Sequence, residues 1–340
     1  MGLSHDNGLG AVKRFLLPSL KLAVVGLLLA YLVGSLRRDR AEILRPQDVA
    51  TRWEWLLLAQ AFIGLSLLLA FHRLRLLLRA QGIEYGFREA VALGFMGPFF
   101  NQFAPGATGG DIAKAYCVAR DHPRRRTGGV TAVLLDRAAG LVALLFIAAL
   151  GIGINWPEVA SNAMLSSLAL LVGAMLAGAA ALSALLFSGR LRWLPSGGVL
   201  GKLRDAIDAY RSRPKLLAQM LLLSIVSQLS MVGMAVSYAE ALGGGAEIGS
   251  FFYLVPLVHV ALSIPVGLPG GLGQSELAYR ELFDLAGYPY GLPLALIQRL
   301  NWCLWALVGG VYCLRRRRSQ APSGSGVPAC VQASMEAAST

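Results

Sequence analysis

A glycine-rich break that ends in an acidic residue lies between two apolar segments. Its sequence is Pro269-Gly-Gly-Leu-Gly-Gln-Ser-Glu276, with an apolar run from residue 251 before it and a short helical pattern after it. In a membrane, the backbone N–H and C=O groups of such a break have no partners in lipid. We therefore expect this stretch to be buried within the protein or to line a wet cavity.

The same pattern occurs once more, earlier in the chain. Residues 105–111 read Pro-Gly-Ala-Thr-Gly-Gly-Asp after an apolar run, and a half-helix to Ala119 can follow. Each break precedes an apolar segment with an arginine, which is Arg137 in the first copy and Arg299 in the second. From proline to arginine the separation is 32 residues in the first copy and 30 in the second. This internal repeat predicts two related halves.

Long uncharged segments define the class of protein. The chain is 56% hydrophobic and 15% charged, with a mean hydropathy of +0.58, whereas soluble domains carry about 25% charged residues. Several windows of about 20 residues can cross a hydrocarbon core of about 30 Å. The net charge of +12 comes from short basic clusters between apolar runs, as in orientation determinants. We therefore expect anionic lipid head groups, and no nucleic acid, as neighbours.

These segments predict an all-α polytopic membrane protein in two halves, residues 1–154 and 155–318. The first half is expected to contain spans at 15–36, 53–71 and 127–154 and a broken helical hairpin at 88–119. The second half is expected to contain spans at 163–187, 216–242 and 292–314 and a broken hairpin at 250–287. Residues 319–340, rich in Ala, Ser, Gly and Pro, are expected to form a disordered cytoplasmic tail.

The distribution of basic residues predicts an inverted arrangement of the halves. Segments 72–88, 120–126 and 188–215 are basic, whereas the turns at 155–161 and 243–249 contain no basic residue. The positive-inside rule then puts the basic segments and both termini in the cytoplasm. With six full spans, each broken segment must enter and leave the membrane on one side, the first from the cytoplasm and the second from outside. The alternative is eight spans, with both broken segments crossing fully.

Inverted repeats with broken helices at mid-depth are typical of secondary transporters. The N-terminus of a half-helix carries a partial positive charge, which suits a phosphate or carboxylate group. The sequence therefore predicts a transport function and not only residence in a membrane.

Four elements of the two halves, taken in order, resemble a known family. They are P-x-x-x-G-G-D, the Asp-Arg of the next span, P-G-G-L-G-x-x-E, and the arginine of the last span. Together they resemble the flippase-like transmembrane region of lysylphosphatidylglycerol synthases over about residues 15–318. The resemblance implies translocation of an anionic phospholipid or polyprenyl-linked lipid in a bacterial inner membrane. We expect no lysine transfer, because no aminoacyl-transferase domain follows Leu314.

Arg137 and Arg299 are the principal candidates for binding substrate. Both lie in the first half of a long apolar span, and a guanidinium can hold a phosphate with two hydrogen bonds. Asp111 and Glu276 begin half-helices, where they can cap the N-terminus, pair with the arginines or exchange protons. Asp136 points about 100° away from Arg137 on a helix and is expected to serve another pair.

The glycines of the breaks and nearby polar side chains complete the predicted site. We expect positive φ angles and close backbone approach at Gly109, Gly110, Gly270, Gly271 and Gly273. We expect the cavity to be lined by Asn101, Gln102, Gln274 and Ser275. His72 and His259 have no partners at metal-ligand spacing, so we expect neither a metal nor a cofactor.

Two other classes of function remain open. An intramembrane enzyme is one, although the chain contains no metalloprotease, phosphate-loop or nucleophile-elbow motif, and we expect no catalysis. The other is a scaffold that recruits a cytoplasmic synthase through segment 188–215. Within that segment Leu203, Ile207 and Tyr210 share one helical face, which predicts an amphipathic helix lying on the membrane. The sequence predicts no oligomeric state.

Overall fold

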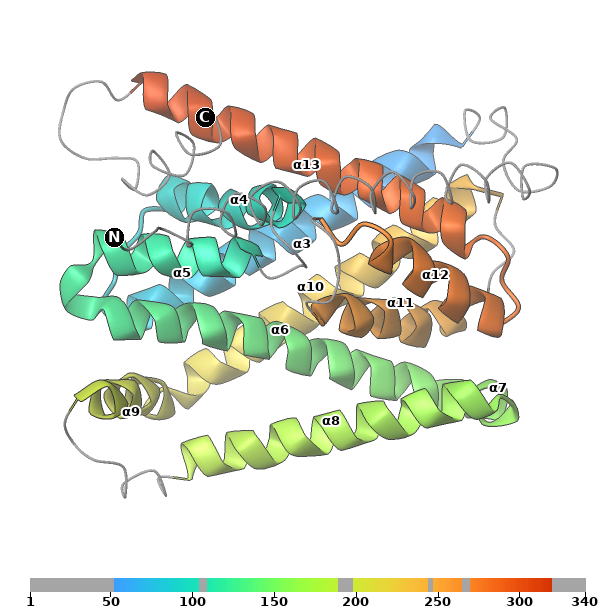
Figure 1. Cartoon of the computed structure of the whole chain (residues 1–340), viewed down its shortest axis with the longest axis horizontal. Helices are drawn as coiled ribbons and strands as arrows, with labels where there is room; N and C mark the ends of the chain where they lie inside the picture. The colour runs from blue at the N-terminus through green and yellow to red at the C-terminus, as the bar shows by residue number, and fades with distance from the viewer. Residues whose placement is uncertain (1–51, 104–108, 189–197, 244–246, 265–269, 320–340) are drawn as a thin grey trace, which may run out of the picture.

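The structure is a computed structural model that describes residues 52–103, 109–188, 198–243, 247–264 and 270–319 (Figure 1). Within these ranges the chain forms eleven α-helices and one short 3-10 helix, η1 (Pro123–Arg125), and it forms no strand. The prediction of an all-α protein is therefore confirmed. The predicted span 15–36 and the tail after Ser319 lie outside the described residues.

Five of the described helices are long and apolar enough to cross a membrane. They are α3 (Trp53–Ala80), α6 (Arg126–Ile154), α8 (Ala163–Phe187), α10 (Pro214–Ala241) and α13 (Gly291–Ser319). All five coincide with predicted spans. Helix α3 continues for about two turns beyond residue 71, the predicted end of the second span, and Arg73 in this extension is buried.

The ends of these helices follow from local chemistry. The Asn162 side chain accepts hydrogen bonds from the N–H groups of Met164 and Leu165 and so caps α8. Pro214 is the first residue of α10, where its missing N–H costs no hydrogen bond. Gly82, with φ of +72°, follows the end of α3 and turns the chain back.

The two breaks each separate a pair of shorter helices. The first pair is α4 (Phe87–Phe103) and α5 (Gly109–Asp121), and the second is α11 (Ile248–Ser263) and α12 (Gln274–Leu285). Their lengths of 17, 13, 16 and 12 residues correspond to about 18–26 Å at 1.5 Å per residue. Each pair packs together as a hairpin, and Figure 1 places the pairs in opposite halves of the bundle's length.

The long helices surround these hairpins. Helix α3 packs along α10, and α6 packs against α10, α11 and α5. The larger buried apolar cluster joins α3, α6, α10 and α11, and a smaller one joins the C-terminal end of α3 with α4 and α5. Helix α8 contacts mainly α6 and the short helix α7 (Trp156–Ser161), so most of its apolar surface faces outward.

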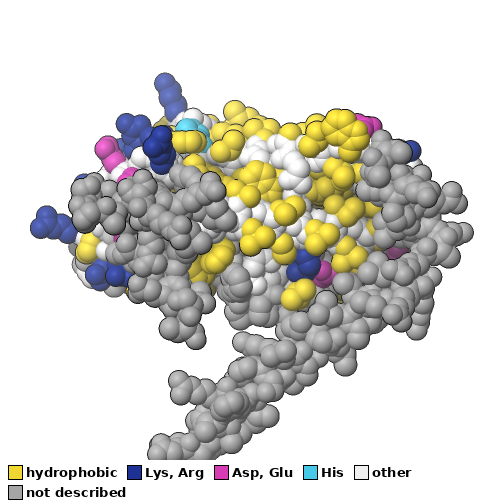
Figure 2. Space-filling model, turned by 90° about the horizontal axis from the view of Figure 1, so that it is seen from above, with side chains coloured by type: hydrophobic (Ala, Val, Ile, Leu, Met, Phe, Trp, Pro, Cys, Tyr) yellow, Lys and Arg dark blue, Asp and Glu magenta, His cyan; other side chains and the backbone are white. Residues whose placement is uncertain are grey.

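The outer surface divides into an apolar middle and a basic end. In Figure 2 hydrophobic side chains cover most of the described surface, and Lys and Arg gather at one end. The exposed basic residues near that end include Arg79, Arg88, Arg120, Arg124, Arg125 and Arg126. Helix α9 (Gly198–Arg211) lies at the same end in Figure 1.

Helix α9 differs from the prediction in what its apolar face contacts. Ala206, Ile207 and Tyr210 are buried against the bundle, and the Tyr210 hydroxyl donates a hydrogen bond to the Leu77 carbonyl at 3.0 Å. The 3.6-residue periodicity predicted a helix correctly. Part of the apolar face of α9, which was expected to lie on the membrane, is instead covered by the protein's own helices.

Candidate functional site

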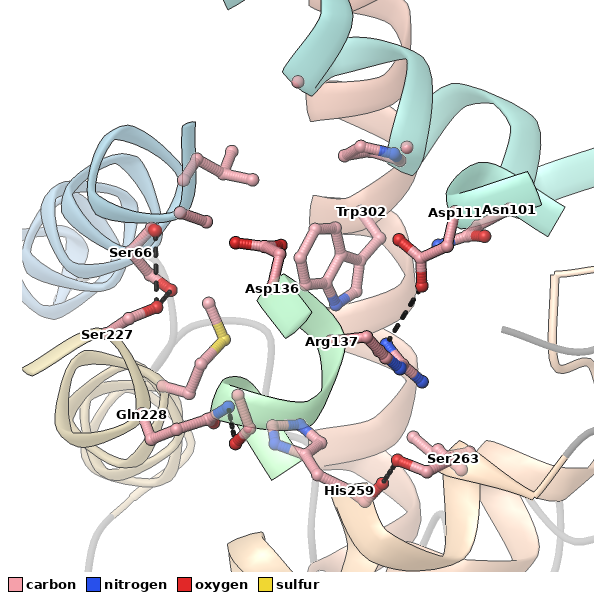
Figure 3. A pocket seen from close by; sticks show the side chains of 18 of the residues that line it. Ser66, Asn101, Asp111, Asp136, Arg137, Ser227, Gln228, His259, Ser263 and Trp302 are labelled. Carbon is pink, nitrogen blue, oxygen red and sulfur yellow. Dashed lines mark hydrogen bonds and ion pairs between the residues drawn. The ribbon is translucent and has the colours of Figure 1, made fainter. Parts of the chain in front are cut away.

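A cavity of about 360 Å³ lies between the two hairpins and the long helices. Its walls come from both halves of the chain, with contributions from α3, α4, α5 and α6 and from α10, α11 and α13. Figure 3 shows Asp136, Arg137 and Asp111 on one side and His259 and Ser263 on another. The charged side chains that line the cavity are Arg73, Asp111, Lys114, Asp136, Arg137 and Arg299.

The first arginine–acid pair is Arg137 with Asp111. Arg137 Nη1 lies 3.6 Å from Asp111 Oδ2, and the Lys114 ammonium lies 3.4 Å from Asp111 Oδ1. One carboxylate is therefore shared by two cations. The Arg137 side chain is 43% exposed and that of Asp111 is 25% exposed, so this pair is open to the cavity (Figure 3).

The second pair, Arg299 with Glu276, is enclosed. Arg299 Nε and Nη2 donate to the two carboxylate oxygens of Glu276, with 3.0 Å between Nη2 and Oε2. The guanidinium also donates to the carbonyls of Gly270 and Gly271, at 3.2 and 3.1 Å. The side chains are only 17% and 6% exposed. Arg299 therefore fixes the backbone of the break as well as the acid.

Glu276 has a second role at the start of α12. Its Oε2 accepts the N–H of Gly273 at 2.8 Å, which is half of a capping box. Gly270, Gly271 and Gly273 have φ angles of +69°, +66° and +81°, and only glycine adopts such angles without strain. The positive φ angles predicted at these three positions are therefore confirmed.

The first break is built differently. Gly109 and Gly110 are helical, so the prediction of positive φ angles there was wrong. A Cβ on Gly110 would lie only 2.3 Å from the Gly97 carbonyl oxygen of α4, which confirms the predicted close approach of two backbones. The Asn101 side chain accepts the Gly110 N–H at 2.7 Å. A polar side chain of α4 thus holds the start of α5.

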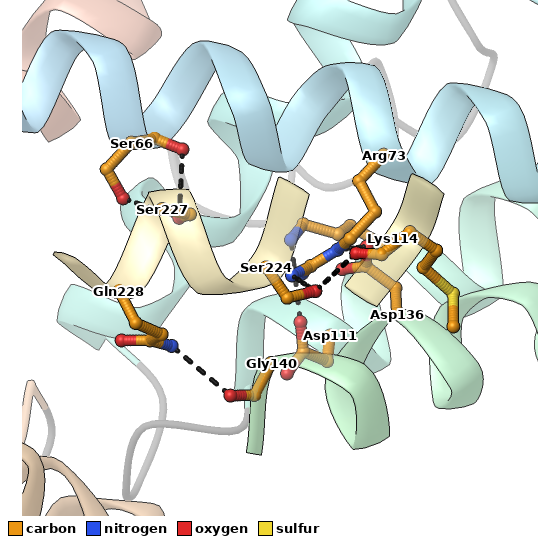
Figure 4. Close-up of polar contacts among 10 residues, drawn as sticks. Ser66, Arg73, Asp111, Lys114, Asp136, Gly140, Ser224, Ser227 and Gln228 are labelled. Atoms are coloured by element: carbon orange, nitrogen blue, oxygen red, sulfur yellow. Dashed lines mark hydrogen bonds and ion pairs between the residues drawn. The ribbon is translucent and has the colours of Figure 1, made fainter. Parts of the chain in front are cut away.

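A third ion pair lies deeper in the wall and contains Asp136. Arg73 Nε donates to Asp136 Oδ1 at 2.7 Å, and Arg73 Nη1 donates to Ser224 Oγ at 2.7 Å (Figure 4). Both ionic side chains are buried, and together they join α3, α6 and α10. The expectation that Asp136 serves another pair than Arg137 is confirmed. Its partner was missed, because Arg73 was assigned to a basic loop.

The cluster carries one excess positive charge. Four cations, Arg73, Lys114, Arg137 and Arg299, stand against the carboxylates of Asp111, Asp136 and Glu276. Two pairs are matched one to one and are largely buried. The excess lies at Asp111, which has two cationic partners. An anion that enters the cavity therefore meets an unbalanced positive charge at Lys114 and Arg137.

The predicted polar residues fall into two groups. Asn101, Gln102, Gly271 and Ser275 line the cavity. Gln274 instead donates to the carbonyls of Ala261 and Ile264 at 2.7 and 3.0 Å, so it ties the start of α12 to the end of α11. Gly109, Gly110 and Gly273 also lie outside the cavity lining formed by the described residues.

Several lining residues were not predicted as part of the site. His259 and Gln298 face each other, with 3.3 Å between His259 Nε2 and Gln298 Nε2, and Trp302 points into the same space. Lys114 follows Asp111 by three residues, a helical spacing that places both on one face. Arg73 follows Ser66 by seven residues, so the same helical spacing would have predicted their shared orientation toward the cavity.

Fold and site together define a polytopic helical membrane protein with a charged internal cavity. Residues 19–309 match the family described as the lysylphosphatidylglycerol synthase TM region. The match covers most of the chain, so the chain belongs to this family, as its sequence elements predicted. No curated protein and no solved structure gave a match. No group of three or more His, Cys, Asp or Glu within the described ranges could hold a metal ion.

Proposed function

We propose that the protein is a lipid translocase that moves an anionic phospholipid or a lipid-linked intermediate between the leaflets of a bacterial inner membrane. The observation that carries this proposal is the cavity between the two hairpins, which has an excess positive charge and walls from both halves. Charged groups at membrane depth are costly, and they persist where they serve a substrate or ion pathway.

The arrangement of the hairpins supports an inverted repeat. Hairpin α4–α5 opens toward the basic end of the bundle and hairpin α11–α12 toward the other end (Figure 1). In our proposal both hairpins re-enter the membrane from opposite sides, with six full spans around them. The basic end faces the cytoplasm, in agreement with the positive-inside rule. The inner ends of α4, α5, α11 and α12 then lie near mid-depth, where secondary transporters bind their substrates.

The size and surroundings of the cavity favour a lipid head group. A volume of about 360 Å³ lies in the lower part of the range of small-molecule sites, about 300–1,000 Å³. That space holds a phosphate-bearing head group, whereas the acyl chains stay in the surrounding lipid against the apolar outer surface. Arg137 supplies the exposed guanidinium for the phosphate. The proposal assigns no bond-making or bond-breaking step to the protein.

Translocation in liposomes tests the proposal. The purified full chain is reconstituted into vesicles that carry a fluorescent phosphatidylglycerol in both leaflets, and dithionite reports the fraction that reaches the outer leaflet. We expect wild type to accelerate exchange and Arg137→Ala to slow it about 10- to 100-fold. Arg124→Ala, which removes an exposed arginine outside the cavity, is the matched control. If neither this lipid nor a polyprenyl phosphate is exchanged by wild type, the protein is an enzyme or a scaffold.

A further inference from the structure

The Asp111 carboxylate is bound more loosely than the other acids of the cavity. Its distances to Lys114 and Arg137 are 3.4 and 3.6 Å, whereas strong charge-assisted N–H···O bonds measure about 2.7–2.9 Å. Arg73 and Asp136 meet at 2.7 Å in the same cavity. Asp111 thus balances two cations at once and makes a short contact with neither of them.

We propose that Asp111 is a counter-ion that the substrate phosphate displaces, and that Lys114 is a second phosphate-binding cation beside Arg137. The proposal rests on the function proposed above, because it describes how the same cavity takes up an anionic head group. In the empty cavity Asp111 holds both cations. When the phosphate enters, its oxygens replace Asp111 on Arg137 and approach Lys114.

This exchange keeps the cations paired. An unpaired charge in a low-dielectric cavity is unfavourable. If the phosphate were the only partner of these cations, its departure would leave them unpaired, and release would be slow. Here Lys114 retains Asp111 while Arg137 takes the phosphate, and Asp111 returns to Arg137 when the phosphate leaves. The acid therefore weakens binding but accelerates release, which a transporter needs at both ends of its cycle.

Packing of α4 against α5 holds Lys114 in this position. A Cβ on Gly97 would lie 2.7 Å from both Cε and Nζ of Lys114, so the end of the lysine side chain lies directly over this glycine. The Lys114 side chain is 14% exposed and lines the cavity. Gly97→Ala would therefore shift the ammonium and leave the charge of the cavity unchanged.

Two other roles for Asp111 predict different behaviour. If Asp111 only stabilised the N-terminus of α5, its neutral variant would lose stability and its phosphate affinity would not rise. If Asp111 carried a proton, the neutral variant would lose the response of transport to a pH gradient and would bind phosphate with unchanged affinity. Of the three roles, only that of a displaced counter-ion predicts that the neutral variant binds phosphate more tightly and transports lipid more slowly.

The deciding experiment measures binding and transport separately on the full chain. Calorimetry with water-soluble dihexanoyl phosphatidylglycerol gives the Kd, and the vesicle assay gives the exchange rate. We expect Asp111→Asn to bind about tenfold more tightly and to exchange lipid several-fold more slowly, since removing one opposing charge-assisted contact changes affinity by about that factor. Lys114→Met should bind about tenfold more weakly, and the double variant should bind like wild type.

Unchanged or weaker binding by Asp111→Asn would overturn the proposal, and so would wild-type binding by Lys114→Met. Gly97→Ala provides an independent variant, because it keeps all charges and should weaken binding in the same direction as Lys114→Met. If the variants show the expected affinities but wild type exchanges no lipid, the phosphate site is supported and the proposed translocase function is wrong. Lipid exchange by wild type without the binding pattern would leave the translocase standing and remove this role for Asp111.

Discussion

The two arginine–acid pairs come from the same sequence pattern and have different surroundings. Arg299 is held by both oxygens of Glu276 and by two backbone carbonyls, and it is largely buried. Arg137 has one long contact with Asp111, which it shares with Lys114, and it is half-exposed. A repeated motif therefore does not imply a repeated role. The hydrogen bonds around Arg299 and Glu276 stabilise the second break. Arg137 and Asp111 are instead exposed to the cavity, where a ligand can reach them.

Arg299→Ala should have the largest effect on stability. The change leaves Glu276 buried without its cation and frees the carbonyls of Gly270 and Gly271, and breaking a buried pair in this way costs about 3–5 kcal/mol. We expect a large drop in the thermal unfolding temperature of the purified protein in detergent. A wild-type unfolding temperature combined with lost lipid exchange would assign Arg299 to substrate binding, the role that we propose for Arg137.

Arg137→Ala should separate activity from stability. The lost contact is long and partly exposed, so we expect the free energy of unfolding to change by less than about 1 kcal/mol. Lipid exchange should fall about 10- to 100-fold, because a charged hydrogen bond to substrate contributes about 1.5–3 kcal/mol. Vesicle exchange and thermal unfolding of the same preparation check both parts. A strongly destabilised Arg137→Ala would make the two pairs equivalent.

Asn101→Ala tests how the first break is held. Its side chain is the acceptor for the Gly110 N–H at the start of α5, and losing such a cap costs about 1 kcal/mol. We expect a small loss of thermal stability and faster hydrogen exchange in α5, measured by mass spectrometry. Asn101→Asp should retain the protection, since a carboxylate also accepts this hydrogen bond. Equal exchange in Asn101→Ala and wild type would mean that this bond does not hold α5.

Gln274→Ala should have a similarly small effect on stability and should act on the other hairpin. Its amide donates to the carbonyls of Ala261 and Ile264 near the end of α11, and a neutral hydrogen bond contributes about 0.5–1.5 kcal/mol. Hydrogen exchange should increase at the start of α12, with α5 unchanged. An increase in both hairpins would show that the two breaks are coupled and do not open separately.

Much of the fold could be predicted from hydropathy, glycine content and charge. Five predicted spans coincide with described helices, and both breaks lie between paired short helices. The position of Arg73 could not be predicted in this way, because it begins a cluster of basic residues directly after an apolar run, and such a cluster indicates the end of a span. Its buried partner Asp136 lies 63 residues away in sequence. Only the packing of α3 against α6 makes an arginine acceptable at that depth.

The residues of the site could be predicted from the sequence, but their surroundings could not. Composition and spacing identified the arginines, the acids and the glycines of the breaks. They did not distinguish the open pair from the enclosed one, because that difference depends on which carbonyls and cations surround each arginine. Likewise, the periodicity of α9 predicted its helix, whereas the burial of Tyr210 depends on the neighbouring α3. Such contacts join residues far apart in the chain.

The shared Glu276 carboxylate also has a mechanical consequence. One side chain of α12 binds the N–H of Gly273 before it and the guanidinium of α13 beside it, while that guanidinium binds the break itself. As long as these bonds persist, the first turn of α12, the turn of α13 that carries Arg299, and Gly270 and Gly271 keep fixed positions relative to one another. A rearrangement that moves the start of α12 must then either break these bonds or carry the adjoining turn of α13 with it.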